Sequence, residues 1–120
     1  MSEQTLYERL GGEKSIREIA ESIFDKHLAN PVISNRYGNT VREEVIPKLV
    51  EFLCEGTGGP QKYTGKNMLD THRGMNISEQ EFMAVLDDIM EALEDHGVGE
   101  REQQELLYAN YAMRREIVRV

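Results

Sequence analysis

The amino-acid sequence predicts an all-α fold, and three features of the 120-residue chain indicate it. Apolar residues recur at the spacing of one face of a helix in each long segment. Residues that begin or end helices stand between these segments, such as Gly11 with Gly12, and Ser78 with Glu81. No segment alternates apolar and polar residues in the way a half-buried strand does.

The first 30 residues are expected to form two helices. Leu6 and Leu10 lie one turn apart in a short helix that Gly11 and Gly12 end. Residues 14–29 follow as an amphipathic helix, and Asn30 with Pro31 stops it.

Residues 31–40 are rich in turn formers, so we expect irregular structure with one short helical turn. Thr40 is expected to cap the helix that follows, whose apolar stripe covers residues 41–53. Pro47 lies inside that stripe and predicts either a kink or the true start of the helix. Four glycines and a proline then make residues 56–65 a long loop.

The second half is predicted to hold three helices. Residues 66–73 form a helix of one or two turns, too short to be stable without packing on something else. The capping box at Ser78 opens the clearest helix of the chain, which Gly97 ends. A last helix is expected over residues 100–118.

Length and composition indicate one domain over residues 1–120. A formal net charge of −8 argues against nucleic acid and anionic membrane as partners. No apolar run reaches the roughly 18 residues that a bilayer requires, and no secretory signal is visible, so we expect a cytoplasmic protein. Cys54 is the one cysteine, which excludes an internal disulfide and predicts a small buried hydrophobic residue.

Three histidines are the candidates for chemistry. His96 falls in the last turn of a helix, where it complements the helix dipole. His27 lies on an apolar helix face, either as a packed core histidine or as a polar group that points into a pocket. No H-E-x-x-H or G-x-S-x-G motif is present, which argues against a zinc hydrolase and a serine hydrolase.

His72 differs from the other two because it lies on a short helix between glycine loops, one turn after Met68. Haem iron needs one neutral imidazole, an apolar slot for the porphyrin and an open or weakly filled sixth position. A flat apolar cofactor would also give this short helix something to pack against. Spacing alone leaves both a haem ligand and an ordinary helical histidine open.

The chain resembles the truncated haemoglobins, the two-over-two helical variant of the globin fold, and is most like group 1. The resemblance is carried by Thr5-Leu-Tyr-Glu-Arg-Leu-Gly-Gly12, Leu28-Ala-Asn-Pro31, Phe52-Leu, Gly58-Gly-Pro-Gln-Lys-Tyr-Thr-Gly65, Met68, His72-Arg-Gly-Met-Asn-Ile77 and Phe82-Met-Ala-Val85. It implies haem b (iron protoporphyrin IX) as cofactor and His72 as the proximal iron ligand. The residues expected to line the haem slot are Phe52, Tyr63, Met68, Phe82 and Val85.

The side of the iron opposite His72 departs from the family pattern. Phe24 stands where the group commonly has tyrosine, and Val45 and Leu49 stand where glutamine is frequent. Tyr37 matches the aromatic residue that closes the pocket, and its hydroxyl could reach the bound ligand. Lys48 matches a position from which some relatives supply a distal ligand to the iron, and a solvated surface lysine is the alternative.

The resemblance implies that the chain binds oxygen, nitric oxide or a similar diatomic ligand, with an enzymatic version that converts nitric oxide to nitrate. An electron donor or reductase would then be a partner, and we expect a monomer or weak dimer. Lys66, Tyr63 and Arg73 are candidates to hold the haem propionates. The alternative is a cofactor-free acidic helical module whose partners dock on its acidic faces or on Tyr108 and Tyr111.

Overall fold

The computed structural model describes residues 4–120, which form helices, their connecting loops and one isolated β-bridge. The predicted all-α class is therefore confirmed. In chain order the elements are α1 (Leu6–Arg9), α2 (Gly12–Ala29), the 3-10 helix η1 (Ser34–Tyr37), α3 (Arg42–Gly56), α4 (Met68–His72), α5 (Glu79–Asp95), α6 (Glu100–Tyr111) and α7 (Arg114–Ile117).

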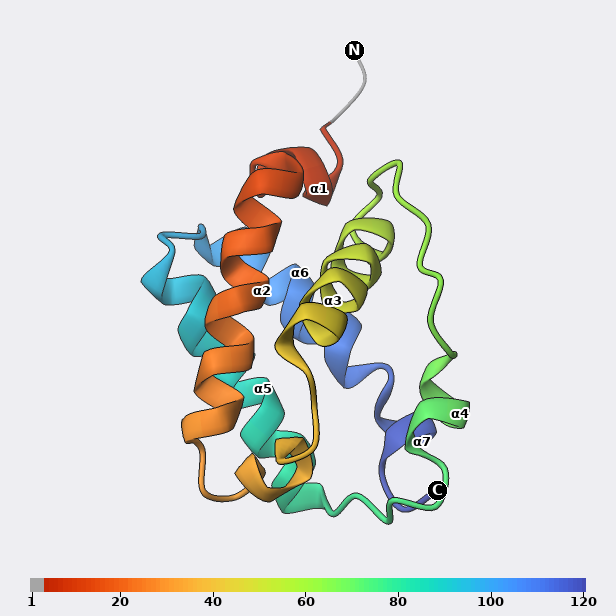
Figure 1. The fold of residues 1–120 in the computed structure, drawn as a ribbon. Helices are drawn as coiled ribbons and strands as arrows, with labels where there is room; N and C mark the ends of the chain where they lie inside the picture. The colour runs from red at the N-terminus through yellow and green to blue at the C-terminus, as the bar shows by residue number, and fades with distance from the viewer. Residues whose placement is uncertain (1–3) are drawn as a thin grey trace.

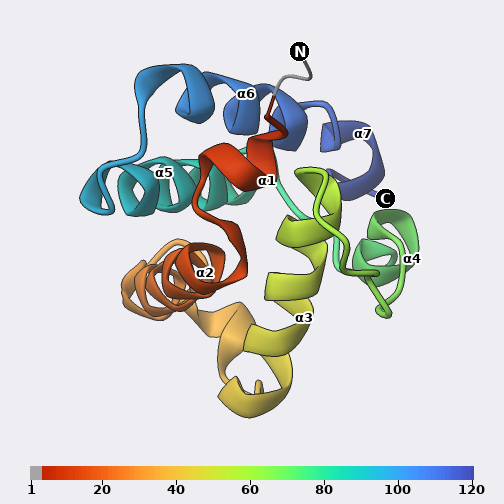
Figure 2. The ribbon, with the colours of Figure 1, turned by 90° about the horizontal axis from the view of Figure 1, so that it is seen from above.

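The four long helices are arranged as two pairs. Helix α2 packs on α3, and α5 packs on α6. Figure 2 shows the α5–α6 pair as one layer and the α2–α3 pair as the other. The two layers meet where α2 packs on α5. Two pairs of helices stacked in this way leave α4 and α7 outside both layers.

Helix α2 connects the two layers because it carries two apolar stripes. Ile16, Ala20 and Phe24 recur every four residues and pack against α3. Ile19 and Ile23 lie on the adjoining stripe and pack against α5 and α6. A helix that is apolar over this wide an arc must be covered on two sides, which makes α2 the contact between the two layers.

Helix α4 stands apart from the two layers. A loop without helix leads from the end of α3 to Met68, and α4 then lies beside α7 near the C-terminus (Figure 1). Backbone bonds fasten this region, since the Gly74 N–H donates to the Val120 carbonyl at 3.2 Å and the Arg119 N–H to the Ile77 carbonyl at 2.9 Å. Ile77 also forms the isolated parallel bridge with Val118.

Several predicted helix boundaries are confirmed. Ser78 caps α5 through a complete capping box with Glu81. Gly11 and Gly12 make the corner between α1 and α2 with φ angles of 102° and 80°, which glycine alone adopts without strain. Gly97, with φ of 70°, follows the end of α5.

In the α3 region one prediction was wrong, and one of two alternatives for Pro47 is excluded. Thr40 does not cap α3, because its hydroxyl donates to the Tyr37 carbonyl at 2.6 Å and Val41 is the residue before the helix. Of the two alternatives for Pro47, a kink or the true start of the helix, the start is excluded, because α3 begins at Arg42 and continues through the proline. Burial of Ile46 and Val50 on either side of Pro47 stabilises this turn against the loss of one backbone donor.

The predicted helix over residues 100–118 is two helices. It ends at Tyr111, and α7 begins at Arg114 after a turn at Ala112 and Met113. The break lets α7 leave the axis of α6 and reach α4 (Figure 1). Apolar periodicity continued through the turn, so it gave no sign of this change of direction.

Two expectations from composition can also be compared with the structure. Cys54 is fully buried, as predicted, and burial raises the pKa of its thiol. None of the helices within residues 4–120 has the length and apolar character needed to cross a membrane.

The core predicts the cost of removing one side chain. Leu93→Ala should lower the free energy of unfolding by about 2–5 kcal/mol, because Leu93 is 2% exposed and its loss leaves a cavity. Leu107→Ala is the matched control at 39% exposure and should change the free energy by less than about 0.5 kcal/mol. Urea unfolding measures both values, and equal losses would contradict the placement of this core.

Candidate functional site

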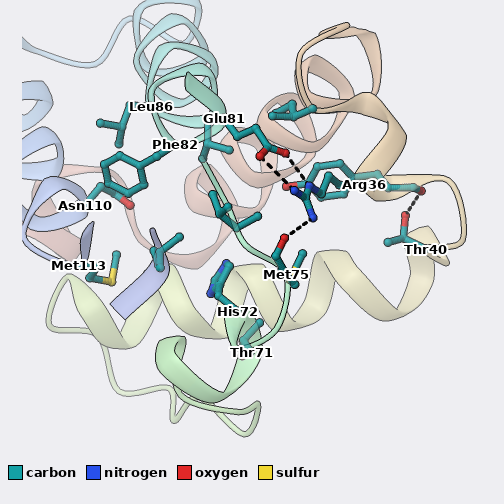
Figure 3. Close-up of a pocket in the computed structure, with 15 residues that line it drawn as sticks. Arg36, Thr40, Thr71, His72, Met75, Glu81, Phe82, Leu86, Asn110 and Met113 are labelled. Carbon is teal, nitrogen blue, oxygen red and sulfur yellow. Dashed lines mark hydrogen bonds and ion pairs between the residues drawn. The ribbon is translucent and has the colours of Figure 1, made fainter. Parts of the chain in front are cut away.

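A cavity of ≈330 Å³ opens between η1, α4, α5, α6 and α7. Figure 3 shows its lining side chains, with His72 and Thr71 on one side and Phe82 and Leu86 across from them. Its apolar walls are Ile33, Met75, Ile77, Phe82, Val85, Leu86, Met113 and Ile117. Arg36, Tyr37, Thr40, Thr71, His72, Glu81 and Asn110 complete the lining.

A backbone carbonyl of its own helix fixes the tautomer of the neutral His72 ring. Its Nδ1 lies 2.8 Å from the Met68 carbonyl oxygen, one turn earlier. A carbonyl oxygen accepts hydrogen bonds and donates none, so Nδ1 carries the hydrogen. The neutral ring therefore keeps its lone pair on Nε2, the nitrogen with which such a ring binds a metal.

The helix that carries His72 is only five residues long and depends on its ends. Asn67 caps it by accepting a hydrogen bond from the Asp70 N–H at 2.8 Å. After Arg73 the backbone turns away at Gly74, whose φ is 85°. These two boundaries fix the turn on which His72 lies.

The distal candidates from the sequence lie together. Phe24 belongs to the core cluster between α2 and α3, and Tyr37, Val45 and Leu49 pack against that cluster. The rings of Phe24 and Tyr37 meet edge to face with centroids 6.0 Å apart. Tyr37 lines the same cavity as His72, so this group reaches the site through Tyr37.

Several other candidates lie outside the cavity lining. Phe52 and Tyr63 contact each other, with ring centroids 5.3 Å apart, and the Tyr63 hydroxyl donates to the Lys66 carbonyl at 2.8 Å. Lys48 donates to the Thr64 hydroxyl and is 51% exposed. These contacts fasten the loop before α4 to α3. Met68 is half-buried and meets His72 through its backbone.

Phe82 and Val85, both predicted as slot residues, line the cavity. The structure thus brings Tyr37, His72, Phe82 and Val85 to one space.

Sequence reasoning missed an ion pair at the edge of this cavity. Arg36 donates from Nε and Nη2 to the Glu81 carboxylate at 2.6 and 3.0 Å, and from Nη1 to the Met75 carbonyl at 3.0 Å (Figure 3). Arg36 first and the Ser78 N–H second lower the pKa of Glu81 to about 2. No local pattern connects residues 45 positions apart, although Glu81 itself was identified as part of the capping box.

The chain matches the model of one protein family, described as bacterial-like globin, over residues 5–118. The chain belongs to the bacterial-like globin family. Among its curated relatives, a group 1 truncated haemoglobin of Tetrahymena pyriformis is 34% identical over 95 residues, 79% of this chain and 78% of the relative. A group 1 truncated haemoglobin of Mycolicibacterium paratuberculosis is 30% identical over 105 residues, covering 88% and 77%.

Solved structures show the same fold for this globin. The truncated haemoglobin of Tetrahymena pyriformis in its Fe(III) form superposes with a TM-score of 0.93 at 29% identity, over 98% of this chain and 100% of that one. The group II truncated haemoglobin of Bacillus anthracis gives 0.89 at 21% identity, over 100% and 95%, and at that identity supports the fold alone. The prediction of a two-over-two truncated haemoglobin, most like group 1, is confirmed.

Family membership makes haem-based ligand binding the function of this globin, rather than that of a cofactor-free module. The residues present fit that group. The cavity offers apolar walls, and His72 offers an imidazole whose Nε2 is free to bind iron.

The Arg36–Glu81 pair predicts a pH-dependent contribution to stability. Because the pKa of Glu81 lies at about 2 in the fold against an ordinary 4.5, the fold favours the ionised carboxylate. Glu81→Gln should therefore lower the free energy of unfolding at pH 7, and the difference from wild type should shrink as pH falls from 4.5 towards 2.

Urea unfolding at a series of pH values measures this difference. Glu79→Gln is the control, because its carboxylate pairs with Arg114 at a more exposed place in the same helical turn. If the loss of unfolding free energy in Glu81→Gln stays constant down to pH 2, the role given to the ion pair is contradicted.

Proposed function

We propose that His72 is the proximal ligand of the iron of haem b, and that oxygen, nitric oxide or a similar diatomic molecule binds on the other side of that iron. The observation that carries the proposal is the hydrogen bond from His72 Nδ1 to the Met68 carbonyl, which directs the lone pair to Nε2. His72 is also the one histidine among residues 4–120 that lines the cavity. When bound, haem would supply the iron that holds the ligand. That iron would also supply the one electron needed when nitric oxide and oxygen combine to nitrate.

The residues expected around the ligand are mostly apolar. Phe24, Val45 and Leu49 have no hydrogen-bond donor in their side chains, whereas the hydroxyl of Tyr37 can donate one. Burial raises the pKa of Tyr37, with Asp88 adding to the effect, so the hydroxyl keeps its proton at neutral pH. We propose that the Tyr37 hydroxyl is the donor that lengthens the time oxygen stays bound, and that any conversion of nitric oxide to nitrate depends on it.

Haem carries two propionates, which need cationic or hydroxyl partners. Lys66 and Arg73 flank α4 and are exposed. They are proposed to hold the propionates together with the Tyr63 hydroxyl. An electron donor would return the iron to its ferrous form, and the buried thiol of Cys54 fits a reducing cytoplasm.

Replacing the proximal ligand tests the proposal directly. His72→Ala should remove the Soret absorption of reconstituted protein, because no other histidine lines the described cavity. Free imidazole should restore that band in His72→Gly by occupying the vacated ligand position.

His96→Ala is the control, since His96 is an exposed helix cap. It should bind haem as wild type does. A normal Soret band in His72→Ala would refute the proposal.

Lys48 provides a second test, on the sixth iron position. Because Lys48 bonds to Thr64 at the surface, Lys48→Ala should leave the ferric absorption spectrum unchanged between neutral and alkaline pH. A change from low-spin to high-spin in Lys48→Ala would instead make Lys48 the distal ligand, and Lys62→Ala controls for loss of a loop cation.

A further inference from the structure

A buried polar pair lies behind Tyr37, one of the residues that line the cavity. His27 on α2 and Asp88 on α5 are only 6% and 7% exposed. His27 Nδ1 donates to Asp88 Oδ2 at 2.7 Å, and Asn30 Nδ2 donates to both carboxylate oxygens at 3.1 and 3.2 Å. Apolar side chains would fill this place at lower cost, because a buried carboxylate must recover its lost hydration.

The pair reaches the cavity through Tyr37. The His27 ring stacks on the Tyr37 ring with centroids 5.4 Å apart and planes at 28°. Phe24 meets the same tyrosine at 85°. Tyr37 ends a single turn of 3-10 helix, which has little rigidity of its own, so these two rings determine its orientation.

Burial and the nearby charges act in opposite directions on the pKa of His27. Burial lowers the pKa of His27, while the hydrogen bond to Asp88 opposes that effect. From η1, Tyr37 faces the ring, and Arg36 near that tyrosine is paired with Glu81. The net effect lowers the pKa of His27, which favours the uncharged ring at neutral pH with its Nδ1–H donating to Asp88.

We propose that His27 and Asp88 are positioning residues for Tyr37, and that they act through its ring on the release of the diatomic ligand. The inference rests on the proposed function, because it needs a ligand beside Tyr37. Asp88 fixes the His27 ring in its plane, and that ring supports one face of Tyr37. Loss of either residue frees Tyr37 from the orientation in which its hydroxyl serves the ligand.

A double-mutant cycle on the haem-loaded full chain tests the inference. The oxygen dissociation rate is measured for wild type, His27→Ala, Tyr37→Phe and the double variant. His27→Ala should raise the rate at least about threefold, and should have less than half that effect when Tyr37 is already phenylalanine. His96→Ala is the control and should leave the rate unchanged. Equal effects of His27→Ala in both backgrounds would overturn the inference.

A second readout does not depend on ligand release. Histidine ring NMR of the diamagnetic carbon monoxide complex follows the titration of His27. Asp88→Asn should move the His27 midpoint to lower pH, because Asp88 opposes the effect of burial, and should leave His96 unchanged. The Tyr37 ring resonance should shift with the same midpoint as His27. A Tyr37 resonance that ignores this titration would overturn the inference even if Asp88→Asn folds poorly.

The two proposals fail in different ways. If wild type shows a normal Soret band but the effects of His27→Ala and Tyr37→Phe on the oxygen dissociation rate are independent, the role of His27 is refuted and His72 remains the iron ligand. Absence of haem binding in wild type removes both.

Discussion

A five-residue helix is too short to be stable in water by itself, so the position of His72 depends on what holds the two ends of α4. Asn67 caps the beginning, and the C-terminal segment around Val118 and Val120 fastens the chain just beyond the end. Within that frame the Met68 carbonyl selects the hydrogen position on the His72 ring. The long helices can then be understood as the support that keeps a cavity open in front of this one imidazole.

The region around Tyr37 is held by core packing rather than by a short capped helix. Phe24, Val45 and Leu49 lie behind Tyr37 in the core between α2 and α3 and do not line the cavity, so they cannot become polar without loss of packing. Tyr37 is different because it lines the cavity and carries a hydroxyl on a ring that packs against the core. The buried pair of His27 and Asp88 links this tyrosine to α2 and α5, the two helices that join the layers of the fold. The role proposed for this pair would connect ligand retention with core packing through one ring.

Local chemistry explains what the sequence could predict. The capping box at Ser78 and the glycines at 11 and 12 act within a few residues, and the boundaries they predict are confirmed. Phe82 and Val85 follow from helical periodicity together with the family resemblance, and both line the cavity. The continuation of α3 through Pro47 could not be read locally, because burial of Ile46 and Val50 outweighs the missing donor.

Long-range partners explain what was missed. The Arg36–Glu81 and His27–Asp88 pairs join residues 45 and 61 positions apart, and no periodic pattern specifies such a pairing. The one available signal was a polar residue on the apolar face of each of two helices, His27 on α2 and Asp88 on α5. The family resemblance was likewise insufficient for Lys48, because it did not predict the hydrogen bond that the Lys48 ammonium donates to the Thr64 hydroxyl.

A crystal structure of the haem-loaded chain is the most direct test of the central claim, that α4 presents His72 Nε2 to the iron. The expected result is an iron bonded to Nε2 while Nδ1 still donates to the Met68 carbonyl, with Tyr37 on the opposite face of the haem. An iron held by any other residue, or a haem bound away from the cavity that His72 lines, would contradict it.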